Sequence, residues 1–218
     1  MYDCRCSCWL ADMPQYLSQR RRLLQSVRAA GIQRESLFIT SKVSPSHLDA
    51  QSLLRSCEAS LRRLQMDYLD LYLIQCPAPN MRLGETFRAL NKLVADGKIR
   101  HLGVSNFDLS QLQLAQSVCA TPIVTNQVPY SLGDRSYVEN RMLACCQAND
   151  ILLTAYSPVQ QSGLKVNAAL QSIAESHNAT VQQKRVITIP MSGNPKHQAD
   201  NLAAGEIELR ETEMVALG

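Results

Sequence analysis

The sequence has no long apolar run and no marked excess of either charge, and we expect no secretory leader. No stretch approaches the roughly 18 apolar residues that a membrane-spanning helix needs, and no apolar region at the N-terminus precedes a small-residue cleavage site. The 22 Lys and Arg against 19 Asp and Glu leave a net charge of +3, so electrostatics give no reason to expect nucleic acid or an anionic membrane as a partner. With 218 residues, 45% of them hydrophobic, we expect a cytoplasmic globular protein.

The eight cysteines lack the spacing of a metal site. Cys4, Cys6 and Cys8 are each separated by a single residue, whereas zinc ligands are spaced by two to four residues and come with a second pair. We therefore expect no metal site, and no disulfide framework in a chain of this size and context. The other five lie in patterned segments, where a free cysteine acts as a small buried hydrophobe: Cys57, Cys76, Cys119, Cys145 and Cys146.

Short apolar runs rich in β-branched and aromatic residues recur along the chain and predict buried strands. They are Leu37–Ser41, Tyr68–Ile74, Arg100–Val104, Ile123–Asn126, Ile151–Tyr156 and Val186–Ile189. The intervals carry apolar residues at helical spacing, as in Leu53–Leu64, Phe87–Val94 and Leu109–Val118, the last behind a plausible N-cap at Asp108. Met142, Leu143 and Cys146 predict a further helix before Ile151, and Leu170, Ile173 and Ala174 predict another after it. Strands alternating with helices predict a parallel α/β sheet.

Two closures of such a sheet compete, an open doubly wound sheet and a (β/α)8 barrel. The first predicted strand runs into Lys-Val-Ser-Pro rather than the GxGxxG of a dinucleotide fold. Polar residues follow the strands instead, as the chemistry of a barrel requires: Lys42, Gln75, Ser105 with Asn106, Asn126 with Gln127, Tyr156 with Ser157, and Ser192. We therefore predict an incomplete (β/α)8 TIM-barrel fold with about six clear strands. It would form one domain over residues 1–218, with an atypical segment at 1–26.

Six segments, read together, resemble the aldo-keto reductase family of NAD(P)H-dependent barrel enzymes. They are LFITSK (37–42), LDLYLIQCP (69–77), GKIRHLGVSNF (97–107), TNQVPYS (125–131), LLTAYSP (152–158) and ITIPMSGNPKHQADNLAA (187–204). The likeness covers roughly residues 27 to 204 and keeps the family's order and spacing. Compared with the family pattern, we expect the chain to be shortened at its N-terminus and before the last predicted strand.

The resemblance implies a catalytic set built from Tyr, Lys, Asp and His, in which the Lys ammonium lowers the pKa of a proton-donating phenol. Lys42 matches the Lys, and Gln75 occupies the His position, where its amide can hold a carbonyl oxygen but cannot carry charge. Trp9 falls at the Asp position, and Tyr16 is the available phenol. The alternatives are a solvated Lys42, a Gln75 that only packs, and a Tyr16 on the surface.

The resemblance also implies a nicotinamide site. Ser105, Asn106 and Gln127 match the residues that hydrogen-bond the carboxamide, and Tyr156, followed by Ser157, matches the ring on which the nicotinamide stacks. The alternative for each residue is a structural role, as a polar group at a strand end that is hydrogen-bonded to a neighbouring loop.

The adenosine-phosphate loop of the family matches residues 189–201, with Ser192 as a phosphate ligand and Asn201 as an adenine contact. Met191 stands where a Lys is common and His197 where an Arg is common, and Lys196 compensates in part. Fixed cations are what recognise a 2′-phosphate. We therefore expect NADP or NAD to bind with little discrimination, and preference for NADPH to rise on acidification as His197 gains charge.

The leading hypothesis is an oxidoreductase of reduced activity that transfers hydride from NAD(P)H to a small-molecule aldehyde or ketone. An incomplete catalytic set leaves a second hypothesis open, a non-catalytic protein that uses the nucleotide site as a sensor or scaffold. A third is a truncated product without an independent function. Neither the substrate nor the oligomeric state follows from the residues.

Overall fold

The computed structural model describes residues 31–131, 136–157 and 187–189, together with positions 196, 199–200, 203, 210 and 212–213. The chain divides into two compact units. The first comprises residues 1–126 and 148–151, and the second comprises residues 127–147 and 152–218. Each unit is described below by itself.

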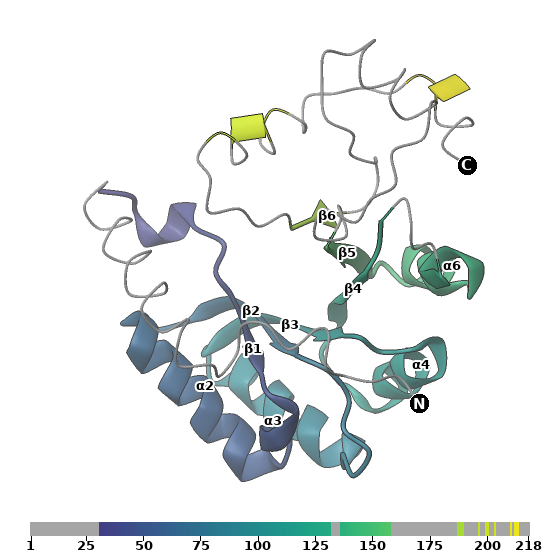
Figure 1. Cartoon of the computed structure of the whole chain (residues 1–218). Coiled ribbons are helices and arrows are strands. Elements are labelled where there is room, and N and C mark those ends of the chain that lie inside the picture. Colours follow the sequence, from purple (N-terminus) through teal and green to yellow (C-terminus); the bar gives the residue numbers. More distant parts are fainter. Residues whose placement is uncertain are drawn as a thin grey trace. The chain divides into compact units, whose positions relative to one another are not determined.

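The first unit is a parallel sheet with helices in its crossovers (Figure 1). Its strands are β1 (Thr40–Val43), β2 (Leu69–Ile74), β3 (Ile99–Ser105) and the first four residues of β4 (Ile123–Pro129), and they adjoin in that order. Its helices are α2 (Ala50–Leu64), α3 (Leu83–Ala95) and α4 (Leu109–Val118), with short 3-10 turns η2 (Arg34–Ser36) and η3 (Pro45–His47). The pairs β1–β2 and β2–β3 are parallel, as predicted. Figure 1 shows α2 and α3 side by side along the strands.

Local signals set where the helices begin. The Asp49 carboxylate accepts a hydrogen bond from the Ser52 backbone N–H at 2.9 Å and caps α2. Asp108 caps α4 as predicted: its carboxylate accepts from the Gln111 N–H at 2.8 Å, while the Gln111 side chain accepts from the Asp108 N–H at 2.9 Å. This reciprocal capping box satisfies two donors that a bare helix start leaves unpaired.

Strand β2 is the centre of the core in this unit. All six of its residues are buried, which is typical of a parallel strand covered on both faces. Leu53, Cys57 and Leu61 of α2 and Leu90 of α3 are also buried. Burial of these apolar faces is the main source of stability for such a layer.

A charged cluster lies at the N-terminal ends of the strands. The Asp70 carboxylate, with 5% of its side chain exposed, binds the Arg34 guanidinium at 2.7 Å and Arg100 at 3.4 Å, and accepts from the Ile39 N–H at 2.8 Å. Both guanidinium carbons lie 4.0 Å from the centre of the Tyr68 ring. The two guanidinium groups give the buried carboxylate the compensation that its desolvation requires, and the ring stabilises the guanidinium groups in turn.

The second unit contains the remainder of β4 and the strands β5 (Leu152–Tyr156) and β6 (Ile187–Thr188), with helix α5 (Ser136–Glu139) and all but the last residue of α6 (Met142–Ala148). Strands β5 and β6 pair in parallel, with Thr154 opposite Ile187. At the end of β5 the Tyr156 carbonyl accepts from the Tyr130 N–H at 3.4 Å. Met142 and Cys146 are buried on α6, the helix that the spacing before Ile151 predicts.

All six predicted strands are present within the described residues, but the bounds of two of them differ from the prediction by more than one residue. Strand β1 spans Thr40–Val43 rather than Leu37–Ser41, so Lys42 lies inside it. Strand β4 continues to Pro129, which puts Asn126 and Gln127 inside the strand and not at its end. The helix expected around residues 170–174 lies outside the described part of the chain.

The predicted burial of the five patterned cysteines is confirmed for Cys57, Cys76 and Cys146, whereas Cys119 and Cys145 are only half-buried. The Cys119 thiol donates to the Thr121 carbonyl oxygen at 3.0 Å. None of the helices formed by the described residues is long and apolar enough to cross a lipid bilayer.

Candidate active site

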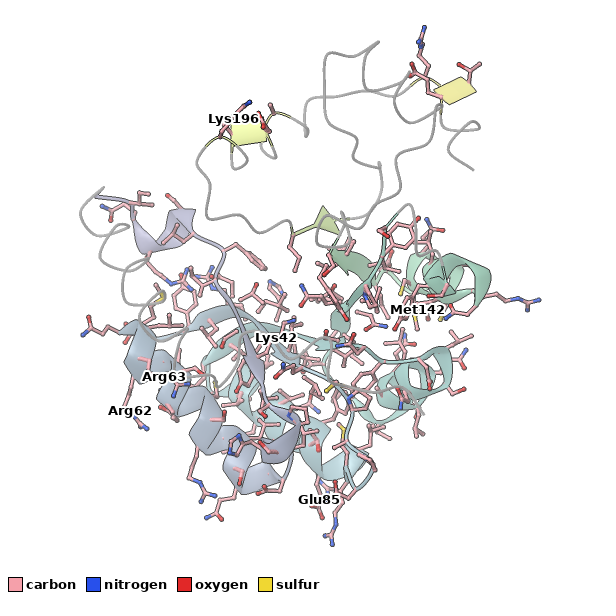
Figure 2. All side chains as sticks on the ribbon, viewed as in Figure 1. Lys42, Arg62, Arg63, Glu85, Met142 and Lys196 are labelled. Carbon is pink, nitrogen blue, oxygen red and sulfur yellow. The ribbon has the colours of Figure 1, made fainter. Side chains whose placement is uncertain are left out.

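Lys42 is the candidate cation that lowers the pKa of the proton-donating phenol, and the structure places it on β1 between the buried residues Ser41 and Val43. It is half-buried and stands opposite Leu73 of β2 in the parallel register. Figure 2 shows Lys42 among the side chains of the first unit, whereas Arg62 lies on the outer side of α2. Lys42 therefore lies near the C-terminal edge of the sheet, where barrel enzymes carry their chemistry.

Gln75 follows β2 directly and ties three strand ends together. Its backbone N–H donates to the Val43 carbonyl at 3.0 Å, and its carbonyl accepts from the Asn106 amide nitrogen Nδ2 at 2.9 Å. The residue is 4% exposed. The sequence-based prediction that Lys42, Gln75, Ser105 and Asn106 share one edge of the sheet is therefore matched by the geometry of the first unit.

Ser105 and Asn106 form the turn that leaves β3. Ser105 is fully buried, and its hydroxyl oxygen accepts from Asn106 Nδ2 at 3.2 Å. Asn106 has a φ of +61°, in the left-handed region that asparagine tolerates better than most residues. Both hydrogens of its amide nitrogen thus have acceptors within the protein, which fixes the direction of the side chain.

Asn126 makes a contact that the sequence motifs, which single out the neighbouring Gln127, do not predict. It is completely buried on β4, and its Nδ2 donates to the Phe107 carbonyl at 3.0 Å. The only signal in the sequence was its place next to Gln127, since a contact between residues this far apart in the chain depends on the fold.

The second unit carries the other described candidates. Gln127 is 4% exposed on β4, and Tyr156 is the half-buried last residue of β5. Ser157 follows with a φ of +53°. Within this unit, the Tyr130–Tyr156 backbone bond links the segment that leaves β4 to the end of β5.

Four predicted site residues lie outside the described residues: Tyr16, Ser192, His197 and Asn201. The same holds for Trp9 and Met191. Of the loop between Met191 and Asn201, Lys196 is described and is exposed. The roles assigned to all these residues stay predictions.

Thiol and metal chemistry have little support in the described part of the chain. Burial raises the pKa of the Cys57 thiol to about 12 and that of Cys146 to about 11, so both are protonated at neutral pH and are poor nucleophiles. Among the described residues, no three His, Cys, Asp or Glu side chains are grouped to hold a metal ion.

Comparison with known sequences gives a consistent picture. The sequence model of the Aldo/keto reductase family matches residues 16–217. A methylglyoxal reductase of Escherichia coli is 39% identical over 199 residues, which cover 84% of this chain and 69% of the relative. A glyoxal reductase of Bacillus subtilis is 38% identical over 197 residues, which cover 86% of this chain and 70% of the relative.

Solved structures agree. A thermostable aldo-keto reductase crystallised with the inhibitor epalrestat has a TM-score of 0.87 and 40% identity, covering 92% of this chain and 76% of its own. An aldo/keto reductase from Klebsiella pneumoniae in complex with NADP and acetate has a TM-score of 0.81 and 34% identity, covering 92% and 75%. These neighbours have the (β/α)8 barrel fold, so the predicted fold class is confirmed.

Proposed function

Because this chain belongs to the aldo/keto reductase family, we propose that it reduces the carbonyl group of a small aldehyde or ketone to an alcohol. The observation that carries the proposal is the grouping of Lys42, Gln75, Ser105 and Asn106 at the C-terminal ends of three adjacent parallel strands. The two relatives named as methylglyoxal and glyoxal reductases make small dicarbonyl compounds the first substrates to test.

The donor set suits a nicotinamide cofactor. A carboxamide presents one acceptor and two donors, and the Ser105 hydroxyl with the Asn106 and Gln127 amides can serve both kinds of atom. We assign the carboxamide to these three residues and the ring to Tyr156, with Ser157 beside it. Reduced NAD or NADP, when bound, supplies the hydride. Crystals of the relatives from Klebsiella pneumoniae hold NADP or NADPH, which supports this cofactor class.

The chain's own residues would handle the oxygen and the proton. The amide nitrogen of Gln75 donates to the carbonyl oxygen and orients it. Tyr16 gives that oxygen its proton, and the Lys42 ammonium stabilises the phenolate that remains. The alcohol then carries one added hydride on carbon and one added proton on oxygen, which balances the reduction.

Replacement of the cation tests this mechanism. We expect Lys42→Met to lower kcat for methylglyoxal by about 10²–10⁴-fold, the usual contribution of general acid catalysis, while NADPH still binds. Lys92→Met is the matched control, since Lys92 lies exposed on α3 in an ion pair with Asp96. Turnover measured by NADPH oxidation that is equal in all three proteins contradicts the mechanism.

A second candidate function, a nucleotide-binding protein without turnover, is favoured by Gln75. Its side chain cannot become a cation at the position that matches the family histidine. We expect Gln75→His to raise turnover if the wild-type chain binds NADPH but reduces carbonyl compounds poorly. Binding of NADPH, without turnover in either protein, would favour the second candidate over the first.

Cofactor choice follows from the two lost cations. With Met191 and His197 at the positions that match common cations, we predict that NADPH and NADH affinities differ by about tenfold or less at neutral pH. Titration of both cofactors by calorimetry at about pH 6 and pH 8 measures this, and the preference for NADPH should be larger at the lower pH. A hundredfold preference at the higher pH contradicts our interpretation of the loop.

A further inference from the structure

The buried amide of Asn126 holds a loop that it does not belong to. Asn126 is 0% exposed on β4, and its Nδ2 donates to the carbonyl oxygen of Phe107, which is itself fully buried, at 3.0 Å. A polar side chain costs free energy to bury and is retained in a core when its hydrogen bond does something that an apolar side chain cannot. Here the bond fixes the direction of one carbonyl group, and therefore the peptide plane between Phe107 and Asp108.

The loop so held is the one that carries the candidate nicotinamide residues. Strand β3 ends at Ser105 and α4 begins at Leu109, so three residues make the whole connection. Asn106 takes a left-handed φ of +61°, a conformation that costs most residues other than glycine about 1–2 kcal/mol and that asparagine tolerates better. Contacts with the surrounding residues hold the turn in this conformation.

Three groups of hydrogen bonds hold the turn. At the far end, the capping box of Asp108 fixes the start of α4. At the near end, the Asn106 amide binds the Gln75 carbonyl and the Ser105 hydroxyl. Between them, the carbonyl of Phe107 accepts a hydrogen bond from the Asn126 side chain, which comes from β4.

We propose that Asn126 is a positioning residue for the cofactor: by holding the Phe107 carbonyl, it keeps Ser105 and Asn106 in the orientation that binds the nicotinamide carboxamide. This inference rests on the proposed function. Misplacement of binding groups by about 1 Å can cost on the order of 10²-fold in rate or affinity, so loss of this bond should act on cofactor binding more than on stability.

The test compares two buried side-chain-to-backbone hydrogen bonds in the same unit. Asn126→Leu removes the donor to Phe107. Thr86→Val is the matched control, because Thr86 is also fully buried, and its hydroxyl donates to the Leu48 carbonyl at 2.7 Å, between α3 and the segment before α2. The readouts are the Kd for NADPH by calorimetry and the thermal unfolding midpoint of each full-length protein.

We expect the two variants to lose similar amounts of thermal stability. We expect the Kd for NADPH to rise about 10- to 100-fold in Asn126→Leu and to stay within about twofold of wild type in Thr86→Val. Equal effects of the two variants on Kd, whether both large or both negligible, overturn the positioning role while leaving the reductase proposal intact. A wild-type chain that binds no NADPH overturns both.

Asn126→Asp gives a second measurement that does not depend on the leucine variant folding. A buried carboxyl has a raised pKa, and its protonated form can donate to the Phe107 carbonyl where the carboxylate cannot. The ratio of the variant's Kd to the wild-type Kd should therefore be large at about pH 8 and approach one as the pH falls toward 5. A ratio that does not change with pH, or stays near one throughout, contradicts the inference.

Discussion

Gly103 on β3 is a position where the addition of a single methyl group should disturb the sheet. A Cβ atom built there would lie 2.7 Å from Leu73 Cδ2, 2.8 Å from Thr125 Cγ2 and 2.9 Å from the Thr125 carbonyl oxygen. All three contacts are closer than atoms of packed proteins tolerate, and the third involves backbone that cannot rotate away. Gly103→Ala should therefore force strands apart, at the upper end of the roughly 1–3 kcal/mol that overpacking costs.

The assay is chemical and thermal unfolding of the variant against wild type. A loss of about 3 kcal/mol in a chain of this size lowers the unfolding midpoint by roughly 6–12 °C. Gly84→Ala is the control, since a Cβ at this helical position in α3 meets nothing within 4 Å, and alanine favours helix by about 0.5–1 kcal/mol over glycine. Gly103→Ala that unfolds at the wild-type midpoint refutes the reasoning.

Two further predictions concern ionisable groups. Asp70→Asn leaves the Arg34 guanidinium without its buried counter-ion and should cost about 3 kcal/mol of unfolding free energy. The control Asp96→Asn, in an exposed ion pair, should cost about 0.5 kcal/mol or less. Equal losses in the two variants would contradict the argument from burial. Burial raises the pKa of the Cys57 thiol to about 12, so the unfolded state loses its proton first as the pH climbs past about 8.5. The contribution of Cys57 to the unfolding free energy is fully present below about pH 8.5, and it should fall by about 1–2 kcal/mol near pH 10. Cys57→Ala should flatten the decline of unfolding free energy between about pH 7 and 10, and parallel curves would argue against it.

Strand positions could be predicted because buried parallel strands are apolar almost throughout, as β2 is. The start of β1 could not, although Leu37–Ile39 continues the apolar run. The Leu37 carbonyl accepts from the Arg34 guanidinium at 2.9 Å, and the Ile39 N–H donates to the Asp70 carboxylate at 2.8 Å. Two side chains thus take up backbone groups that a longer strand would use, and only the fold brings one of them, Asp70, to Ile39.

The candidate site divides in the same way. Lys42, Gln75 and Ser105 could be placed at one edge from the order of the motifs, because parallel strands bring their C-terminal ends together. The left-handed turn at Asn106 and the bond from Asn126 to Phe107 could not, since each depends on which carbonyl lies within reach of an amide. Sequence patterns report which residue types are present at an edge, whereas the direction of their hydrogen bonds is a property of packed loops.

The two ends of these strands use polar residues for different purposes. At the N-terminal end, Asp70 and Arg34 meet at 2.7 Å and satisfy each other's charge within the protein. At the C-terminal end, the hydrogen bond from the Asn106 amide to the Gln75 backbone carbonyl joins two uncharged groups. The cation at this end, Lys42, is half-buried on its strand. A charge satisfied internally stabilises the fold, and an edge built from neutral amides beside a lysine suits a carbonyl substrate, on whose oxygen negative charge develops during reduction. Substitution of Asp70 should therefore change the unfolding free energy far more than the affinity for NADPH. Substitution of Lys42 should instead change turnover far more than the unfolding free energy.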